Sequence, residues 1–354
     1  MNIDLVRDPT FQLNILLWMA KEQPSEGYRV RPVFFERGFR TIYIEKPFPL
    51  PHETSRTSQE SGLDITLAPE PELILARSRN GKALYFEAKA DSFSPASIKN
   101  AKQARGHLLA TGPAFGEVLA PLTSCLLCYL VPDDKRALMF DSLSDLGAEL
   151  SDLGLEPGSF SCHGLRITGQ ELIYAWDSVF RDYVGEPADS ISIMGDLESL
   201  TDPSPLILIF SDEDCPNNEI RDFYRRVLLD QVRARLLCDV QSLLVNEEYE
   251  ITVDELLMRT SDRVFEFLGG ERQKRLRLLI REHLFKRIRD HWRQKQRFIT
   301  LDGSTLRIRW ELADEKEAFL NWLEDRRVKF DATRPEPRRM PLLDNLPEPT
   351  AEED

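Results

Sequence analysis

The stretch from Pro71 to Lys89 constrains the fold of this chain most, because its pattern predicts a β-hairpin. A short apolar run, Leu73 to Ala76, comes first and indicates a strand. Asn80-Gly81 follows, and this dipeptide strongly favours a tight reversal of the chain. A second strand is then expected from Ala83 to Ala90. The stretch therefore predicts two neighbouring antiparallel strands.

Side chains on the second strand should alternate between two faces, since a strand has a period of two. Three apolar side chains fall on one face, which we expect to point into the core: Leu84, Phe86 and Ala88. The other face carries Tyr85, Glu87 and Lys89, and Glu72 opens the neighbouring strand. Two acids and a lysine on adjacent strands can bind a divalent cation and hold a water beside it.

This arrangement resembles the PD-(D/E)XK nuclease superfamily, which has the restriction-endonuclease-like fold. In that family an acid at the start of one strand is followed by Asp/Glu-x-Lys on the next. Pro71-Glu72 resembles the first half, with Glu for the usual Asp, and Glu87-Ala88-Lys89 resembles the second. The resemblance covers roughly residues 30 to 132 and implies a mixed central sheet flanked by helices.

The tripeptide pattern itself recurs at Asp133 and at Asp314, so its context decides the assignment. Only the copy at Glu87 ends an alternating apolar strand behind a hairpin that begins with another acid. The alternative interpretation is an exposed Glu87–Lys89 ion pair on an edge strand, which would have no catalytic role.

The resemblance also implies roles for the residues of the site. Glu72 and Glu87 would ligate Mg²⁺, with Mn²⁺ as a substitute, because hard carboxylate oxygens suit these ions. Asp64, on a predicted adjoining strand, is the alternative to Glu72, and Glu36 is a weaker third candidate. Lys89 would orient or deprotonate the attacking water, or stabilise the negative charge that develops at the phosphate.

A helix is predicted after the second strand, with Ser94 as its cap, Pro95 at its first position and an end near Ala110. Its predicted buried stripe consists of residues three or four apart: Ile98, Ala101, Ala104 and Leu108. Lys99, Gln103 and His107 share another face.

In many relatives within the superfamily, this helix sends a Gln or basic residue toward the metal, and in one branch an aromatic residue follows the Gln by four positions. Gln103 resembles that Gln and is a candidate catalytic residue, while His107 stands at the aromatic position. Lys99 and His107 are candidates for nucleic-acid contact. A plain solvated helix face is the alternative.

The rest of the chain predicts two or three domains, since 354 residues exceed one typical core. We expect a nuclease-like domain at 1–135, a middle α/β region at 136–250, a basic helical domain at 251–333 and a disordered acidic tail at 334–354. The elements expected in the first domain are a helix at 9–22 capped by Asp8, strands at 40–48, 64–67 and 124–131, and a polar loop at 49–62.

The middle region predicts a buried strand at 205–210 and a helix at about 218–237. The acids of Ser211 to Asp214 follow the strand, where a second metal could sit, although no partner acid is evident. A loop that caps the following helix is the alternative.

The net charge of −14 hides a basic stretch, since residues 272–297 hold eleven Lys or Arg and two acids. An apolar stripe on this predicted helix has a spacing of four: Leu276, Ile280, Leu284, Ile288 and Trp292. A hairpin follows at 297–310 with its turn at Asp302-Gly303. Helices, a basic helix and a hairpin follow the order of winged-helix DNA-binding domains. The candidate nucleic-acid-binding residues here are Arg277, Arg281, Arg287, Arg293 and Lys295. A charged solvated helix is the alternative.

Five scattered cysteines indicate core thiols of a cytoplasmic protein, because neither a disulfide framework nor a zinc pattern is evident. The longest apolar runs are too short to span a bilayer, and the N-terminus lacks a signal-peptide pattern, so no membrane association is expected.

Together these features predict an Mg²⁺-dependent DNA endonuclease of α/β fold, with a helical, winged-helix-like domain that contacts DNA. Phage defence, restriction or mobile-element processing is the expected setting. Because no motor or nucleotide-binding segment is evident, other protein subunits are expected as partners, and a second copy is a further candidate. The alternative is a catalytically inactive nuclease-like subunit that binds DNA or supports assembly.

Overall fold

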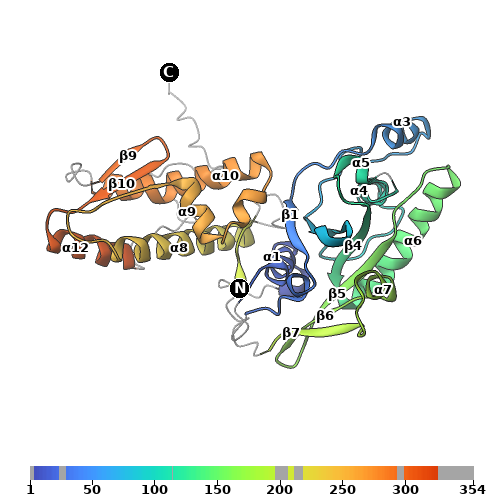
Figure 1. The fold of residues 1–354 in the computed structure, drawn as a ribbon, viewed down its shortest axis with the longest axis horizontal. Helices are drawn as coiled ribbons and strands as arrows, with labels where there is room; N and C mark the ends of the chain where they lie inside the picture. Colours follow the sequence, from blue (N-terminus) through green and yellow to red (C-terminus); the bar gives the residue numbers. More distant parts are fainter. Residues whose placement is uncertain are drawn as a thin grey trace, which may run out of the picture. The chain divides into compact units, whose positions relative to one another are not determined.

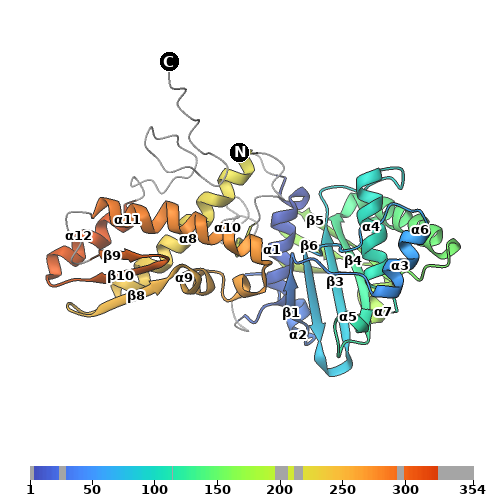
Figure 2. The same ribbon diagram turned by 90° about the horizontal axis from the view of Figure 1, so that it is seen from above.

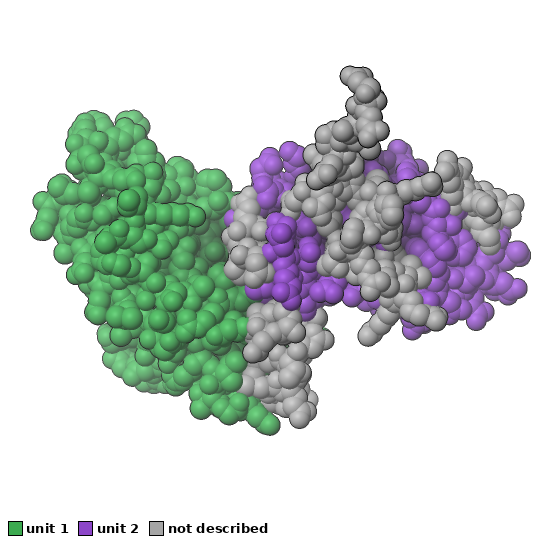
Figure 3. Space-filling view, turned by 180° about the vertical axis from the view of Figure 1, so that it is seen from behind, with its two compact units in different colours: residues 1–206 green, residues 207–354 purple. Residues whose placement is uncertain are grey.

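The computed structural model describes residues 4–23, 29–113, 115–195, 206–210, 218–292 and 299–325. The chain forms two compact units, residues 1–206 and 207–354, shown in green and purple in Figure 3. This division corrects the predicted one, because the expected middle region at 136–250 is shared between the two units. Its first part extends the sheet of unit 1, and its last part belongs to unit 2. The predicted tail at 334–354 lies outside the described residues.

The described residues of unit 1 form a mixed sheet of seven strands in sequential order. Figures 1 and 2 show this sheet with helices packed around it. The strands are β1 (Arg40–Ile44), β2 (Leu73–Arg77), β3 (Lys82–Ala88), β4 (Ser124–Pro132), β5 (Phe160–Thr168), β6 (Glu171–Ala175) and β7 (Ser190–Met194). Neighbours are antiparallel except that β4 runs parallel to both β3 and β5. The expected mixed α/β class is therefore confirmed.

The predicted hairpin is formed by β2 and β3, whose last pair is Arg77 with Lys82. A 3₁₀ turn, Ser78–Asn80, precedes Gly81, which has a φ of +63°. A side chain at this left-handed position would be strained, so glycine suits it.

The helices of unit 1 cover both faces of the sheet. They are α1 (Pro9–Ala20), α2 (Val33–Glu36), α3 (His52–Glu60), α4 (Ile98–Ala110), α5 (Phe115–Val118), α6 (Arg136–Asp152) and α7 (Ser178–Val184). Residues of α4 and α6 share a core with Tyr85 of β3. On the opposite face, Phe34 of α2 contacts Phe86 of β3 and Phe180 of α7.

Strand β3 is buried on both faces, so the face predicted to carry Tyr85, Glu87 and Lys89 is covered as well. Tyr85 has no exposed area and Glu87 is 1% exposed. The edge-strand alternative is wrong, because β3 lies between β2 and β4. A strand in the middle of a helix-covered sheet has no solvent face.

Several elements of unit 1 differ from the predicted ones in where they end or in their type. Helix α1 is capped by Asp8 as predicted, since its carboxylate accepts from the backbone N–H of Thr10. Strand β1 ends before the predicted residue 48, the predicted strand at 64–67 is absent from the described fold, and α3 occupies the predicted loop at 49–62. Pairing between strands, which local pattern does not specify, decided the two strand cases.

Helix α4 starts later than predicted, at Ile98 with Ser97 as its N-cap residue. The backbone carbonyl of Ser94 accepts from the N–H of Ser97, so Ser94 begins a turn instead of a helix. Ile98, predicted to be buried, is 78% exposed at this first position, whereas the rest of the predicted stripe is buried.

Unit 2 combines helices with a small antiparallel sheet of order β8-β10-β9. Its elements are α8 (Asn218–Gln241), β8 (Glu248–Thr252), α9 (Val253–Thr260), the 3₁₀ turn η6 (Val264–Phe267), α10 (Gly270–Ile280), the π-helical turn η7 (Arg281–Phe285), α11 (Lys286–His291), β9 (Ile299–Asp302), β10 (Thr305–Arg309) and α12 (Ala313–Glu324). The apolar stripe from Leu276 to Ile288 is buried as predicted, and Trp292 is partly buried. Asp302 and Thr305 close the predicted second hairpin.

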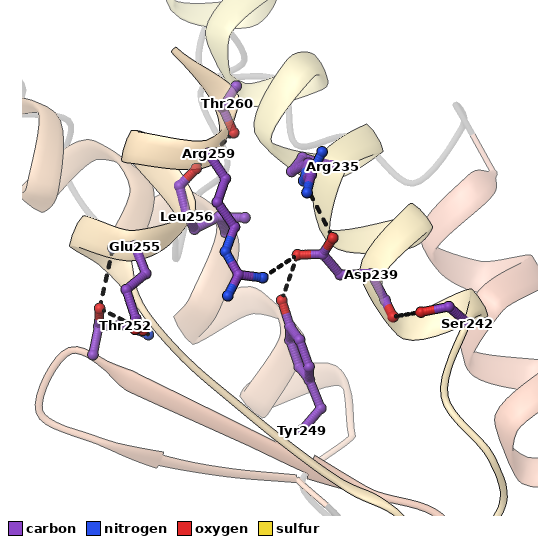
Figure 4. Close-up of polar contacts among 9 residues, drawn as sticks. All are labelled: Arg235, Asp239, Ser242, Tyr249, Thr252, Glu255, Leu256, Arg259 and Thr260. Atoms are coloured by element: carbon purple, nitrogen blue, oxygen red, sulfur yellow. Dashed lines mark hydrogen bonds and ion pairs between the residues drawn. The ribbon is translucent and has the colours of Figure 1, made fainter. Parts of the chain in front are cut away.

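Strand β8 was not predicted from the sequence, and a polar cluster ties it to two helices (Figure 4). The carboxylate of Asp239 in α8 lies 3.2 Å from Arg235 Nε and 3.0 Å from Arg259 Nη1 of α9. It also accepts a 2.9 Å hydrogen bond from the Tyr249 hydroxyl of β8. Three elements of unit 2 thus share one nearly buried acid.

The apolar segment predicted as a strand at 205–210 is buried from Leu206 to Phe210 but is not a strand. The acids that follow it at 211–214 lie outside the described residues. The predicted helix after them is α8. No helix among the described residues is both long enough and apolar enough to cross a membrane.

Candidate functional site

Three residues predicted to be catalytic meet at the end of β3. The Nζ atom of Lys89 lies 2.6 Å from Oε1 of Glu87. The Nε2 atom of Gln103 donates to the same oxygen at 2.9 Å, and Lys89 Nζ donates to Gln103 Oε1 at 3.1 Å. Acid, amine and amide therefore form a closed triangle, which we call the Glu87 cluster.

Backbone pairing and helix packing position this cluster. Glu87 is held in the parallel ladder between β3 and β4, and the backbone N–H of Lys89 donates to the carbonyl of Leu130 just past its end. Helix α4 brings Gln103 to the sheet by burying Ala101 and Ala104. Side chains two residues apart on β3 thus share the face that α4 covers.

His107, one turn after Gln103, extends the cluster inward. Its ring is fully buried, with Nε2 3.4 Å from Oε2 of Glu87. The Tyr85 hydroxyl lies 2.8 Å from Nδ1 of the same ring. Burial lowers the pKa of His107 to about 4 and raises the pKa of Tyr85, so at neutral pH the ring is neutral and the phenol keeps its proton.

This position corrects the expectation that His107 contacts nucleic acid. A ring with no exposed area cannot touch a phosphate group, and its partners are Tyr85 and Glu87. Lys99, on the same helix, is exposed as a nucleic-acid contact requires.

Glu72 directly precedes β2, whose first pair is Leu73 with Phe86. Continuing this antiparallel register by one residue sets the backbone of Glu72 opposite that of Glu87. Asp64 is placed differently: it lies outside the strands, and its carboxylate is 2.7 Å from Lys102 Nζ. The structure therefore does not bring Asp64 to the Glu87 cluster.

The weaker candidate Glu36 is exposed at the end of α2. That helix packs on Phe86, which points to the face opposite Glu87. In the described part of the chain, no three His, Cys, Asp or Glu side chains gather around a possible metal position.

Sequence reasoning missed Glu45, an acid that follows β1 and is 2% exposed. Its φ of +44° is unusual for a residue with a side chain, and its N–H donates to the carbonyl of Pro71 at 3.0 Å. The sequence signal for Glu45 is an acid near the end of a strand, but the predicted strand continues through Glu45 to residue 48. Glu45, Glu72 and Glu87 thus lie at the ends of three neighbouring strands.

The candidate basic residues of unit 2 differ in their exposure and in whether an acid offsets their charge. Arg277 makes a two-point ion pair with Asp254 at 2.6 and 3.0 Å, which offsets its charge. Arg281 is 44% exposed and Arg287 is half-buried, whereas Arg293 and Lys295 lie outside the described residues. Lys274, which the prediction omitted, is 74% exposed.

A cavity of about 430 Å³ lies apart from the Glu87 cluster, among residues of β5, α6 and the segment around α7. Trp176 and Cys162 line it together with two arginines. Arg136 pairs with Asp133 and Arg181 with Asp189, so neither guanidinium can bind an anion without competing with an internal pair.

Comparison with known proteins adds no relative. No family model, curated protein or solved structure matches the chain.

Proposed function

We propose that this protein is a metal-dependent DNA endonuclease of the PD-(D/E)XK type. The observation that carries the proposal is the closed contact among Glu87, Lys89 and Gln103. These residues come from the end of a strand and from the following helix, as the resemblance implies. A buried acid beside an amine and an amide is the set of groups that the resemblance implies for the site.

The strand arrangement supports the same proposal. Three antiparallel strands, β1 to β3, are followed by α4 and by β4, which returns parallel to β3. An acid precedes β2, and the Glu-x-Lys sequence ends β3. A mixed central sheet flanked by helices is what the resemblance implies for this fold.

The residues present fit Mg²⁺, which binds proteins through one or two carboxylates and completes its shell with water and substrate phosphate. Glu87 offers Oε2, a buried oxygen that accepts no hydrogen bond from the described residues. Glu87 and Glu72 would hold the ion. Mg²⁺ bound there would polarise the phosphoryl oxygen and acidify a bound water.

The protein's own groups have separate tasks in this proposal. The Lys89 amine would orient the attacking water or offset the charge that develops on the phosphate. Gln103 keeps both neighbours in place, since its amide donates to Glu87 and accepts from Lys89. Burial of Glu87 beneath α4 keeps bulk water away from one side of the carboxylate.

Unit 2 would contact the DNA as a winged-helix-like domain. Its order, helix α8, strand β8, helices α9 and α10, then the β9–β10 hairpin, supports this, as does the pairing of β8 with β10. In such domains a helix enters the major groove and contacts base edges. Helix α10 and the turn after it carry the basic residues that would contact the backbone.

The test is plasmid cleavage with Mg²⁺ or Mn²⁺ by the full chain and by Glu87→Gln, Lys89→Ala and Gln103→Leu. We expect cleavage by the first two variants to fall by about 10²-fold or more, because each removes a group placed at the reaction centre. Glu36→Gln, a change of the same type on the opposite sheet face, should cut like the wild type. Circular dichroism spectra must show that every variant is folded.

The second candidate function is a nuclease-like DNA-binding subunit without activity. One observation favours it: no third acid, histidine or cysteine joins a metal position among the described residues. If the wild type and all variants bind DNA alike and none cuts it, this second function replaces the first.

A further inference from the structure

We infer that His107 is a positioning residue for Glu87, in the tautomer whose Nε2–H points at the carboxylate while Nδ1 accepts from the Tyr85 hydroxyl. The catalytic consequence rests on the proposed nuclease function. The arrangement itself rests on contacts among three buried residues, Tyr85 and Glu87 from β3 and His107 from α4.

The contacts fix the direction of the hydrogen bonds. A neutral imidazole has one nitrogen that donates and one that accepts. If Nδ1 carried the proton, the lone pair of Nε2 would face the carboxylate oxygen of Glu87 at 3.4 Å, which is repulsive. With the proton on Nε2, Nδ1 accepts from the Tyr85 hydroxyl at 2.8 Å, and the N–H points at Glu87.

The two facing atoms have no other hydrogen-bond partner among the described residues. Both Nε2 of His107 and Oε2 of Glu87 are buried and make no hydrogen bond of good geometry. Leaving either group unpaired in the interior is costly, so a small closing movement is favourable. Hydrogen bonds of catalytic groups are often long before the substrate binds and shorten in the complex.

The consequence is control of one carboxylate from two sides. Lys89 and Gln103 hold Oε1, while His107 directs Oε2. An oxygen has more than one lone pair, so Oε2 can accept from His107 and still face a cation. Partners of this kind typically affect metal affinity or activity by about 10- to 100-fold.

Two substitutions of His107 separate its two contacts. In His107→Gln the side-chain nitrogen stands as many bonds from the backbone as Nε2 does, so the donor toward Glu87 is kept. In His107→Asn the side chain reaches only the position of Nδ1 and keeps a partner for Tyr85. A purely structural histidine would respond similarly to both changes, because each leaves one buried contact.

The first measurement is Mn²⁺ binding to the full-length protein by calorimetry. We expect His107→Gln to bind close to wild type and His107→Asn to lose about 10- to 100-fold in affinity. Tyr85→Phe should weaken binding in the wild-type background and add little in the His107→Gln background, since no ring nitrogen there accepts from the hydroxyl. Equal losses in the Gln and Asn variants, or additive effects of Tyr85→Phe, would overturn the inference.

The second measurement needs neither metal nor cleavage. The ring ¹⁵N resonances of His107, assigned by their absence in His107→Gln, should show the Nε2–H tautomer in the wild type. A wild-type Nδ1–H ring contradicts the inference whatever the activity. If the wild type binds no Mn²⁺, the nuclease proposal fails, and the ring tautomer alone then decides this inference.

Discussion

Two buried histidine–tyrosine pairs occupy opposite faces of the large sheet. Tyr85 pairs with His107 on the α4 face, and Tyr174 lies 2.6 Å from Nδ1 of His163 on the other. His163 also contacts Phe180 edge-on, with ring centroids 4.6 Å apart. The His107 ring lies 3.4 Å from the carboxylate of Glu87, and among the described residues the His163 ring has no carboxylate at such a distance. Only the first pair therefore belongs to the candidate site. Local sequence did not separate the two, because burial and partner are properties of the sheet.

His163 should make the protein less stable in acid. Burial lowers its pKa to about 3 against the ordinary 6.5; Asp177 opposes the shift and Arg136 adds to it. Between these values the unfolded chain binds a proton that the folded protein does not, so stability falls as pH drops below 6.5. His163→Asn, which retains an acceptor for Tyr174, should lower the slope of unfolding free energy against pH by up to about 1.4 kcal/mol per unit between pH 6 and 4.

Urea unfolding of wild type and His163→Asn across this range measures that slope. An unchanged slope contradicts the prediction, whatever the absolute stability of the variant.

At the scale of elements, α4 is the part that assembles the site. The spacing of its apolar residues predicts that α4 is a helix and which side of it is mostly buried. It predicts neither the residue at which α4 starts nor how closely the helix packs on the sheet. Gly106 allows α4 to lie close to the segment that precedes β2, since a Cβ atom there would lie 2.5 Å from the carbonyl oxygen of Thr66. The same helix carries Gln103 and His107, so its position against the sheet sets their distance from Glu87.

Gly106→Ala should therefore impair both stability and cleavage. We expect a loss of about 1–3 kcal/mol, because overpacking moves neighbouring backbone. The matched control is Gly147→Ala in α6, where an added Cβ meets nothing within 4 Å. That change should raise stability by about 0.5–1 kcal/mol through helix propensity. Thermal unfolding and plasmid cleavage of both variants test this pair, and similar behaviour of the two would contradict it.

At the scale of the whole molecule, the average charge conceals how charge is distributed. A net charge of −14 argues against a nucleic-acid partner, yet the stretch at 272–297 is strongly basic. In unit 2 part of that basic charge is offset within the fold, as in the pair between Arg277 and Asp254. Lys274 and Arg281 are seven residues apart, so they lie on one side of the helix and are exposed there.

Lys274→Ala with Arg281→Ala should weaken DNA binding and flatten its dependence on salt. Each lost phosphate contact lowers the slope of log affinity against log salt by about one. Arg226→Ala, which removes an exposed charge from α8, is the control and should leave the slope unchanged. Fluorescence anisotropy across a salt series measures both. If the double variant and the wild type have the same slope, α10 does not contact the DNA.

What the sequence alone determined is the β2–β3 hairpin, β4, the cap and course of α1, and the buried stripe of the basic helix. Each depends on local rules of turn chemistry and periodicity. The tertiary structure alone decided that the seven described strands of unit 1 form one sheet, that β3 has no solvent face, and that Glu45 borders the site. Strand pairing and burial join residues far apart in sequence, so no local pattern could specify them. The contact of Gln103 with Glu87 depends on both: residue spacing predicts the helix that carries Gln103, and the sheet sets where that helix lies.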